Sequence, residues 1–307
     1  MRACAAQGGG AGLSINGALR VATEKSLFAM PEAVIGFFPD VGATHFLNRL
    51  PGNLGLCMAL TGTPLRRKLR LKLIRALNSR RLRAGLRLRG RELRDVGLAT
   101  HYVDSDSLPL LMRRLADLGD SASELAVMRN AITEHESTKM MEPIPTDSIV
   151  HKLPLIDAWF AGETVEAIDE ALAAAARKGE HAEFAASLRA EMHRAAPMSL
   201  RVAVSAMRRL RNSTLRECML TEFRMVVRFM QASDFYEGVR AQLIDKTGAP
   251  DWKPSNLVGA TADKVEAYFE PLPADIPELD LGPEPGGRPA QRPKSDEQQP
   301  RRQRSRM

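Results

Sequence analysis

Three consecutive glycines, Gly8 to Gly10, stand directly before the small-residue segment 11–15. This pattern predicts a tight turn from a strand into a helix, and therefore a mixed α/β fold in this part of the chain. The first amides of such a helix have no partner within it and lie at the positive end of the helix dipole. Glycines let a ligand approach these amides, which suits a phosphate or an oxyanion. A flexible turn without a ligand explains the triplet alone equally well.

The pattern of apolar residues divides the chain into a mixed front and a helical back. Short apolar runs predict strands at 21–23, 27–30 and 102–103. Helices are predicted within 40–61, with a break at Pro51-Gly52, and at 197–210 and 215–231. From residue 271 onward the chain is rich in Pro, Gly, Arg and Gln, which predicts a disordered tail.

Two acidic residues lie in the apolar stretch that follows the second predicted strand. Glu32 and Asp40 are eight residues apart, and each directly follows a proline. An acid in an apolar pocket has a raised pKa and can exchange protons near neutral pH. Asp40 also precedes an apolar helix, which equally suits an N-cap. From the spacing alone, capping is the more common role for such a residue.

Basic residues are concentrated in two segments. Residues 66–89 contain eleven Lys and Arg and no acid, and residues 286–307 contain seven basic residues and two acids. The formal net charge of +7 comes from these segments, because the remainder of the chain is net negative. The net charge therefore gives no argument that the protein as a whole binds nucleic acid, and only the two segments could support one. No aromatic residue among the arginines of 66–89 supports base stacking.

Other features of the composition exclude further classes. No apolar run is long enough for a membrane-spanning helix, and no secretory signal peptide opens the chain. Cys4, Cys57 and Cys218 are odd in number and far apart, which favours a reducing compartment over a disulfide framework or a zinc cluster. The six histidines show no metal-ligand spacing.

A set of long motifs, jointly specific, resembles the crotonase superfamily, the enoyl-CoA hydratase/isomerase proteins. The resemblance covers roughly residues 8–65 and 88–270. Within the superfamily, the chain is most similar to the 3-hydroxyisobutyryl-CoA hydrolase subfamily. The motifs are the glycine-rich turn 8–14, then 22–25, 27–32, 38–42, 99–105, 234–246 and Trp252-Lys253-Pro254.

The resemblance implies an α/β fold, a crotonase-like ββα spiral followed by a helical C-terminal region that packs over the core. The portion of the family that precedes the glycine triplet is not matched, so we expect a spiral that is incomplete at its N-terminus and a poorly active enzyme. The expected regions are 1–65 (partial core), 66–88 (basic insertion), 89–195 (remainder of the core and connecting helices), 196–272 (C-terminal helical region) and 273–307 (disordered tail).

The same resemblance assigns the chemistry to Glu32 and Asp40. It implies that Glu32 is the nucleophile or the general base, and that Asp40 contacts the substrate hydroxyl or orients water. Gly9 and Gly10 match the family's oxyanion-binding and substrate-binding turn. Enoyl-CoA hydratases have a second glutamate at the position of Gly12 and a glycine at that of Asp40. Hydrolysis of 3-hydroxyisobutyryl-CoA, a step of valine breakdown, is therefore implied rather than hydration.

The expected partners and location follow from the resemblance as well. The substrate is an acyl-CoA, the CoA belongs to the substrate, and neither a metal nor a separate cofactor is implied. A homo-oligomer is expected, without a membrane span and without nucleic acid. The family implies a mitochondrial location in a eukaryote and a cytoplasmic one otherwise, and we expect no targeting segment within residues 1–307. Two alternatives stay open: another crotonase reaction such as enoyl-CoA hydration, and a non-catalytic fragment that binds acidic partners through residues 66–89.

Overall fold

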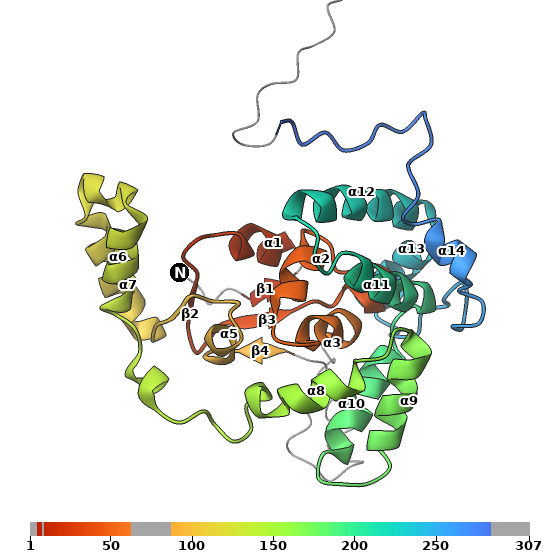
Figure 1. The fold of residues 1–307 in the computed structure, drawn as a ribbon, viewed down its shortest axis with the longest axis horizontal. Helices are drawn as coiled ribbons and strands as arrows, with labels where there is room; N and C mark the ends of the chain where they lie inside the picture. Colours follow the sequence, from red (N-terminus) through yellow and green to blue (C-terminus); the bar gives the residue numbers. More distant parts are fainter. Residues whose placement is uncertain (1–4, 8, 63–86, 284–307) are drawn as a thin grey trace, which may run out of the picture.

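The computed structural model describes residues 5–7, 9–62 and 87–283 of the 307-residue chain (Figure 1). Gly8, nearly all of the expected basic segment and the greater part of the expected tail lie outside these residues. The described strands are all short. They are β1 (Ala5–Gln7), β2 (Val21–Ala22), β3 (Leu27–Ala29), β4 (Leu88–Arg89) and β5 (His101–Tyr102).

The strands form two small sheets. In the first, β3 lies between β1 and β4, parallel to β1 and antiparallel to β4. In the second, β2 and β5 are parallel. Leu88, the last residue of the expected basic segment, pairs with Phe28 in β4 and is fully buried. The strand that completes the first sheet therefore begins within the expected segment.

Helices make up most of the rest of the described chain. Those in the front half are α1 (Gly9–Ile15), η1 (Glu32–Ile35), α2 (Ala43–Phe46), η2 (Leu47–Arg49), α3 (Leu54–Thr61), α5 (Glu92–Asp95), η3 (Ser105–Ser107), α6 (Leu108–Ala116), η4 (Gly119–Ser123) and α7 (Leu125–Thr133). Those in the back half are η5 (Thr138–Met141), η6 (Ile149–Lys152), α8 (Leu153–Trp159), α9 (Val165–Ala175), α10 (Ala182–Met192), α11 (Pro197–Arg209), α12 (Leu215–Gln231), α13 (Asp234–Val239), the π-helical turn η7 (Arg240–Ile244) and α14 (Ala262–Glu266).

The two long helices of the back half confirm the sequence prediction because their ends carry strong local signals. Helix α11 begins at Pro197, whose missing N–H costs nothing in the first turn. Helix α12 begins with a capping box, in which Thr214 and Glu217 exchange side-chain-to-backbone hydrogen bonds. No described helix is long and apolar enough to cross a membrane.

The main apolar core surrounds α3, in which every residue is buried. Helices α8, α10 and α11 contact α3, and the strands lie beside it (Figure 1). A second cluster joins Phe37 and Phe38 to Phe229 of α12 and Tyr268. Helices α6 and α7 form a hairpin that projects from the body and has a small core of its own (Figure 1). The helical back half thus closes over the segment that follows β3.

Candidate active site

The parallel pairing of β1 with β3 brings two sequence motifs to one edge of the sheet. Gln7, at the end of β1, is opposite Ala29, at the end of β3. Helix α1 begins two residues after β1, and Glu32 opens η1 three residues after β3. Because the carboxyl ends of parallel strands meet at the same edge, the first turn of α1 and Glu32 share that edge. The sheet thereby places the glycine turn beside the first candidate acid.

Glu32 is a buried acid with an unused oxygen. Its side chain is 6% exposed, and its Oε2 has no hydrogen-bond partner within the described residues. Burial, with a smaller contribution from the charge of Asp40, raises the pKa of Glu32 to about 8. A buried carboxyl that lacks a structural partner and titrates near neutral pH suits proton transfer or nucleophilic attack.

Asp40 is half-buried, and burial raises the pKa of its carboxyl. Its charge acts on Glu32, so the two acids are electrostatically coupled. The capping alternative for Asp40 is wrong: the N-cap of α2 is Gly42, with no side-chain cap of its own. Asp40 contributes only its backbone carbonyl, which accepts a hydrogen bond from Ala43 N at 3.0 Å. Its side chain therefore does not cap α2.

The glycines at the start of α1 differ in what surrounds them. A Cβ added at Gly9 or Gly10 would meet nothing within 4 Å, and both residues are exposed. A Cβ at Gly12 would lie 2.5 Å from Cβ of Val41. Helix α1 is therefore in close contact with Val41, the residue that follows Asp40. The Val41 side chain occupies the space into which a side chain at residue 12 would extend.

A third acid, which the sequence reasoning missed, holds this loop. Glu222 of α12 is 3% exposed, and its carboxylate accepts hydrogen bonds from the amides of Gly42 and Thr44 and from the Thr44 hydroxyl. A signal was present in the sequence. Glu222 is the one acid in the otherwise apolar stripe of α12, whose buried members are Cys218, Glu222, Met225 and Phe229.

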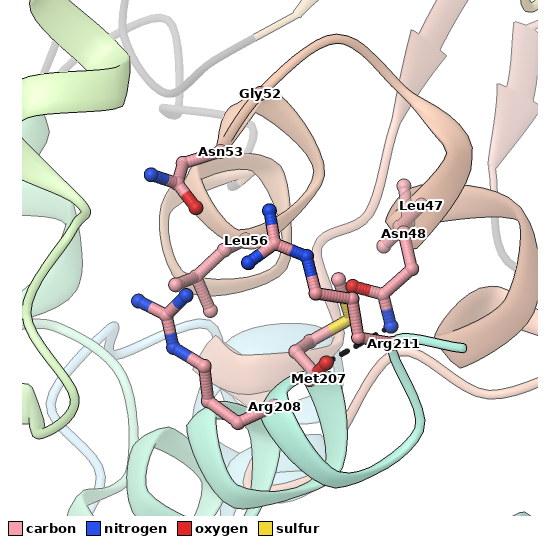
Figure 2. Close-up of a pocket in the computed structure, with 8 residues that line it drawn as sticks. All are labelled: Leu47, Asn48, Gly52, Asn53, Leu56, Met207, Arg208 and Arg211. Atoms are coloured by element: carbon pink, nitrogen blue, oxygen red, sulfur yellow. Dashed lines mark hydrogen bonds between the residues drawn. The ribbon is translucent and has the colours of Figure 1, made fainter. Parts of the chain in front are cut away.

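A small cavity lies away from this site, between the start of α3 and the end of α11 (Figure 2). Its volume of about 10 Å³ is close to the minimum for one water molecule. Arg208, which lines it, donates to the carbonyls of Phe160 and Gly162 at 2.8 Å each. Asn48 donates across it to the carbonyl of Met207 at 3.0 Å (Figure 2). The cavity is thus a small gap between packed helices, and it is too small for a substrate.

Comparison with known proteins assigns the fold. The enoyl-CoA hydratase/isomerase family model matches residues 5–73 and 83–269 and passes over 74–82, within the expected basic segment. A carnitinyl-CoA dehydratase from Mycobacterium thermoresistibile superposes with a TM-score of 0.68 at 31% identity, over 89% of this chain and 67% of that one. The expected crotonase-like α/β fold is confirmed.

The curated relatives point to one subfamily. The mitochondrial 3-hydroxyisobutyryl-CoA hydrolase of Mus musculus is 36% identical over 86% of this chain, and that of Danio rerio is 37% identical over 86%. The chain spans about three fifths of these relatives, 61% and 62% of their lengths. The family model and the relatives assign the chain to the same family, and the two acids that its motifs single out, Glu32 and Asp40, lie in the segment after β3. The chain belongs to the enoyl-CoA hydratase/isomerase family.

Proposed function

We propose that the protein hydrolyses the thioester of 3-hydroxyisobutyryl-CoA to 3-hydroxyisobutyrate and CoA. The observation that carries this proposal is the state of Glu32: buried, with an oxygen that has no hydrogen-bond partner within the described residues, and coupled to Asp40. The names of the relatives described above support the choice of substrate. Their mitochondrial location supports the same location for this protein.

The chemistry follows from the positions of the groups at the sheet edge. Ionised Glu32 either attacks the thioester carbonyl or takes a proton from the attacking water. The exposed amides of the first turn of α1, at Gly9 and Gly10, stabilise the negative charge that develops on the carbonyl oxygen. The C–S bond then breaks, and in the general-base route the CoA thiolate receives the proton that Glu32 took from water. In the nucleophilic route the thiolate takes a proton from solvent, and water then hydrolyses the mixed anhydride between the acyl group and Glu32, which releases 3-hydroxyisobutyrate and frees the carboxylate. Asp40 binds the 3-hydroxyl or orients the water. The reaction uses no metal and no cofactor beyond the CoA of the substrate, and we expect a homo-oligomer.

The contact between Gly12 and Val41 favours hydrolysis over hydration. Hydration in this family uses a second glutamate at the position of Gly12, paired with the acid that corresponds to Glu32. In this chain any side chain at residue 12 would overlap Val41, since even a Cβ would be 2.5 Å from it. Only one of the two carboxylates of a hydratase therefore fits at this site.

The test is release of free CoA thiol from 3-hydroxyisobutyryl-CoA by the 307-residue chain and its variants. Glu32→Gln keeps the size of the side chain but cannot ionise, so we expect kcat to fall by about 10²–10⁴-fold. Glu191→Gln is the matched control. Glu191, on α10, is 2% exposed, and burial raises its pKa to about 7, but its ion-pair partner is Arg194.

Two outcomes would contradict the proposal. Absence of thiol release from the wild-type chain contradicts the proposed reaction, and release that Glu32→Gln leaves unchanged removes Glu32 from it. Faster hydration of an enoyl-CoA than hydrolysis of the hydroxyacyl thioester would assign the chain to a different reaction of the family.

A further inference from the structure

The carboxylate of Glu222 reaches the segment after Asp40 from a helix 178 to 180 residues further along the chain. Its Oε2 accepts from the amide of Gly42 at 2.7 Å. Its Oε1 accepts from the amide of Thr44 at 2.9 Å and from the Thr44 hydroxyl at 2.6 Å. Three donors from the loop thus converge on one carboxyl group of α12. Because hydrogen bonds to an ionised acceptor are about twice as strong as neutral ones, this connection is firmest above about pH 7, where Glu222 is ionised.

The loop needs such a connection because its own backbone is unfavourable. Val41 has φ of 59° and Gly42 has φ of 83°, both in the left-handed region. A β-branched residue in that region is an outlier, and it persists only when its surroundings hold it. The amides of Gly42 and Thr44 are also the free donors at the start of α2, where no local side chain caps the helix. Glu222 satisfies these donors from a distance.

The same helix also holds the chain on the other side of Asp40. Phe229, seven residues after Glu222, packs against Phe37 and Phe38 with ring centroids 5.4 and 5.3 Å apart. Near the start of the helix, a Cβ added at Gly42 would lie 3.2 Å from the Leu215 side chain. One face of α12 therefore contacts the residues before and after Asp40 and leaves Asp40 between the two contacts.

We propose that Glu222 is a positioning residue, which fixes residues 41–44 through its three hydrogen bonds and so aims the Asp40 carboxylate at the substrate. This inference rests on the proposed function for what Asp40 does, and on the hydrogen bonds alone for what Glu222 does. Asp40 is coupled to both Glu32 and Glu222, so the three acids form one group. Glu222 itself does not touch the substrate; it acts through the loop.

The first measurement is amide hydrogen exchange in the loop, in the absence of substrate. Glu222→Gln keeps the size of the side chain but places an amide donor against the backbone donors of Gly42 and Thr44, so at least one bond is lost. By residue-resolved hydrogen exchange, we expect the amides of Gly42 and Thr44 to exchange at least about tenfold faster. The equally buried Glu191→Gln serves as control and leaves these two amides unchanged.

The second measurement asks whether the effect passes through Asp40. A site built to bind a hydroxyl rejects analogues that lack it, so we use the ratio of kcat/KM for 3-hydroxyacyl-CoA to that for plain acyl-CoA. Glu222→Gln and Asp40→Ala each lower this ratio, by about tenfold. In the Asp40→Ala background, Glu222→Gln lowers it no further, because residues that act as one unit are not additive.

Thr44→Val keeps the test decisive if Glu222→Gln does not fold. It removes only the hydroxyl donor, so exchange at residue 44 and the substrate ratio change in the same directions by a smaller amount. Unchanged exchange at Gly42 and Thr44 in a folded variant would overturn the inference, as would a full additional loss of selectivity in the Asp40→Ala background. If the wild-type chain releases no thiol, the proposed function fails, and the exchange experiment still decides whether Glu222 holds the loop.

Discussion

Glu32 combines two properties that suit a catalytic carboxyl group. One of its oxygens has no hydrogen-bond partner within the described residues, and its pKa is near neutrality. Its pKa of about 8 arises first from burial and then from the negative charge of Asp40. At pH 7 the carboxyl is therefore mostly protonated, and the ionised form increases as the pH rises. If Glu32 acts as base or nucleophile, the reaction rate increases with it.

The coupling to Asp40 gives a prediction about pH. Asp40→Asn removes a negative charge that disfavours ionisation of Glu32, so the pKa of Glu32 falls. We expect the acidic limb of the kcat/KM profile to move to lower pH, measured from about pH 5 to 9 with the Glu191→Gln variant as reference. An acidic limb at the same pH in Asp40→Asn and wild type would show that Glu32 does not set the profile.

At the scale of elements, close backbone contacts join the helices around the site. Gly36 caps η1, and a Cβ added there would lie 2.2 Å from the Asp234 carbonyl of α13. A Cβ at Gly238 of α13 would lie 2.3 Å from the backbone of Ile35. Helix α13 and the turn that carries Glu32 thus meet backbone to backbone, an approach that only glycine allows.

The contact between α1 and Val41 yields a prediction about stability. Gly12→Ala places a Cβ 2.5 Å from that of Val41, so we expect a loss of about 1–3 kcal/mol in unfolding free energy from overpacking. Gly10→Ala, two residues earlier in the same helix, meets nothing within 4 Å and gains up to about 1 kcal/mol from helix propensity. Urea unfolding of the two variants measures the difference. Equal stability of the two would mean that Val41 moves aside at no cost.

At the scale of the whole molecule, three buried glutamates couple stability to pH. Burial raises the pKa of Glu32 to about 8, and those of Glu191 and Glu222 to about 7, from the ordinary value of 4.5. Between about pH 4.5 and 8 the folded state therefore binds more protons than the unfolded state. The stability that these groups contribute is fully present below pH 4.5 and is lost as the pH rises through the folded pKa values.

Glu32→Gln isolates one of these contributions. Relative to wild type, the variant should gain stability as the pH rises from 5 to 8, by on the order of 3 kcal/mol, because the amide has no proton to lose. Urea unfolding of both proteins at several pH values measures the gain. Stability curves that run parallel over this range would show that Glu32 ionises normally in the folded protein.

What the sequence alone determined is local. The glycine turn into α1, the strand at 27–29 and the two long helices of the back half all follow from residue propensities and capping signals, which act over a few residues. The family motifs also singled out Glu32 and Asp40, and the structure finds both buried or half-buried and coupled. The position of Leu88 in β4 escaped the sequence reasoning, because a two-residue strand next to a basic segment has too weak a pattern.

What only the tertiary structure decided depends on residues far apart in the chain. The spacing favoured Asp40 as the cap of α2, yet the free amides at that helix start bind Glu222, which is 178 to 180 residues away. The filling of the space beside Gly12 by Val41, and the pKa of Glu32, likewise arise when α1, α12 and the segment after β3 pack together. Hydrogen bonds across such distances, and the loss of water around a carboxyl, exist only once the chain has folded, so no local pattern encodes them.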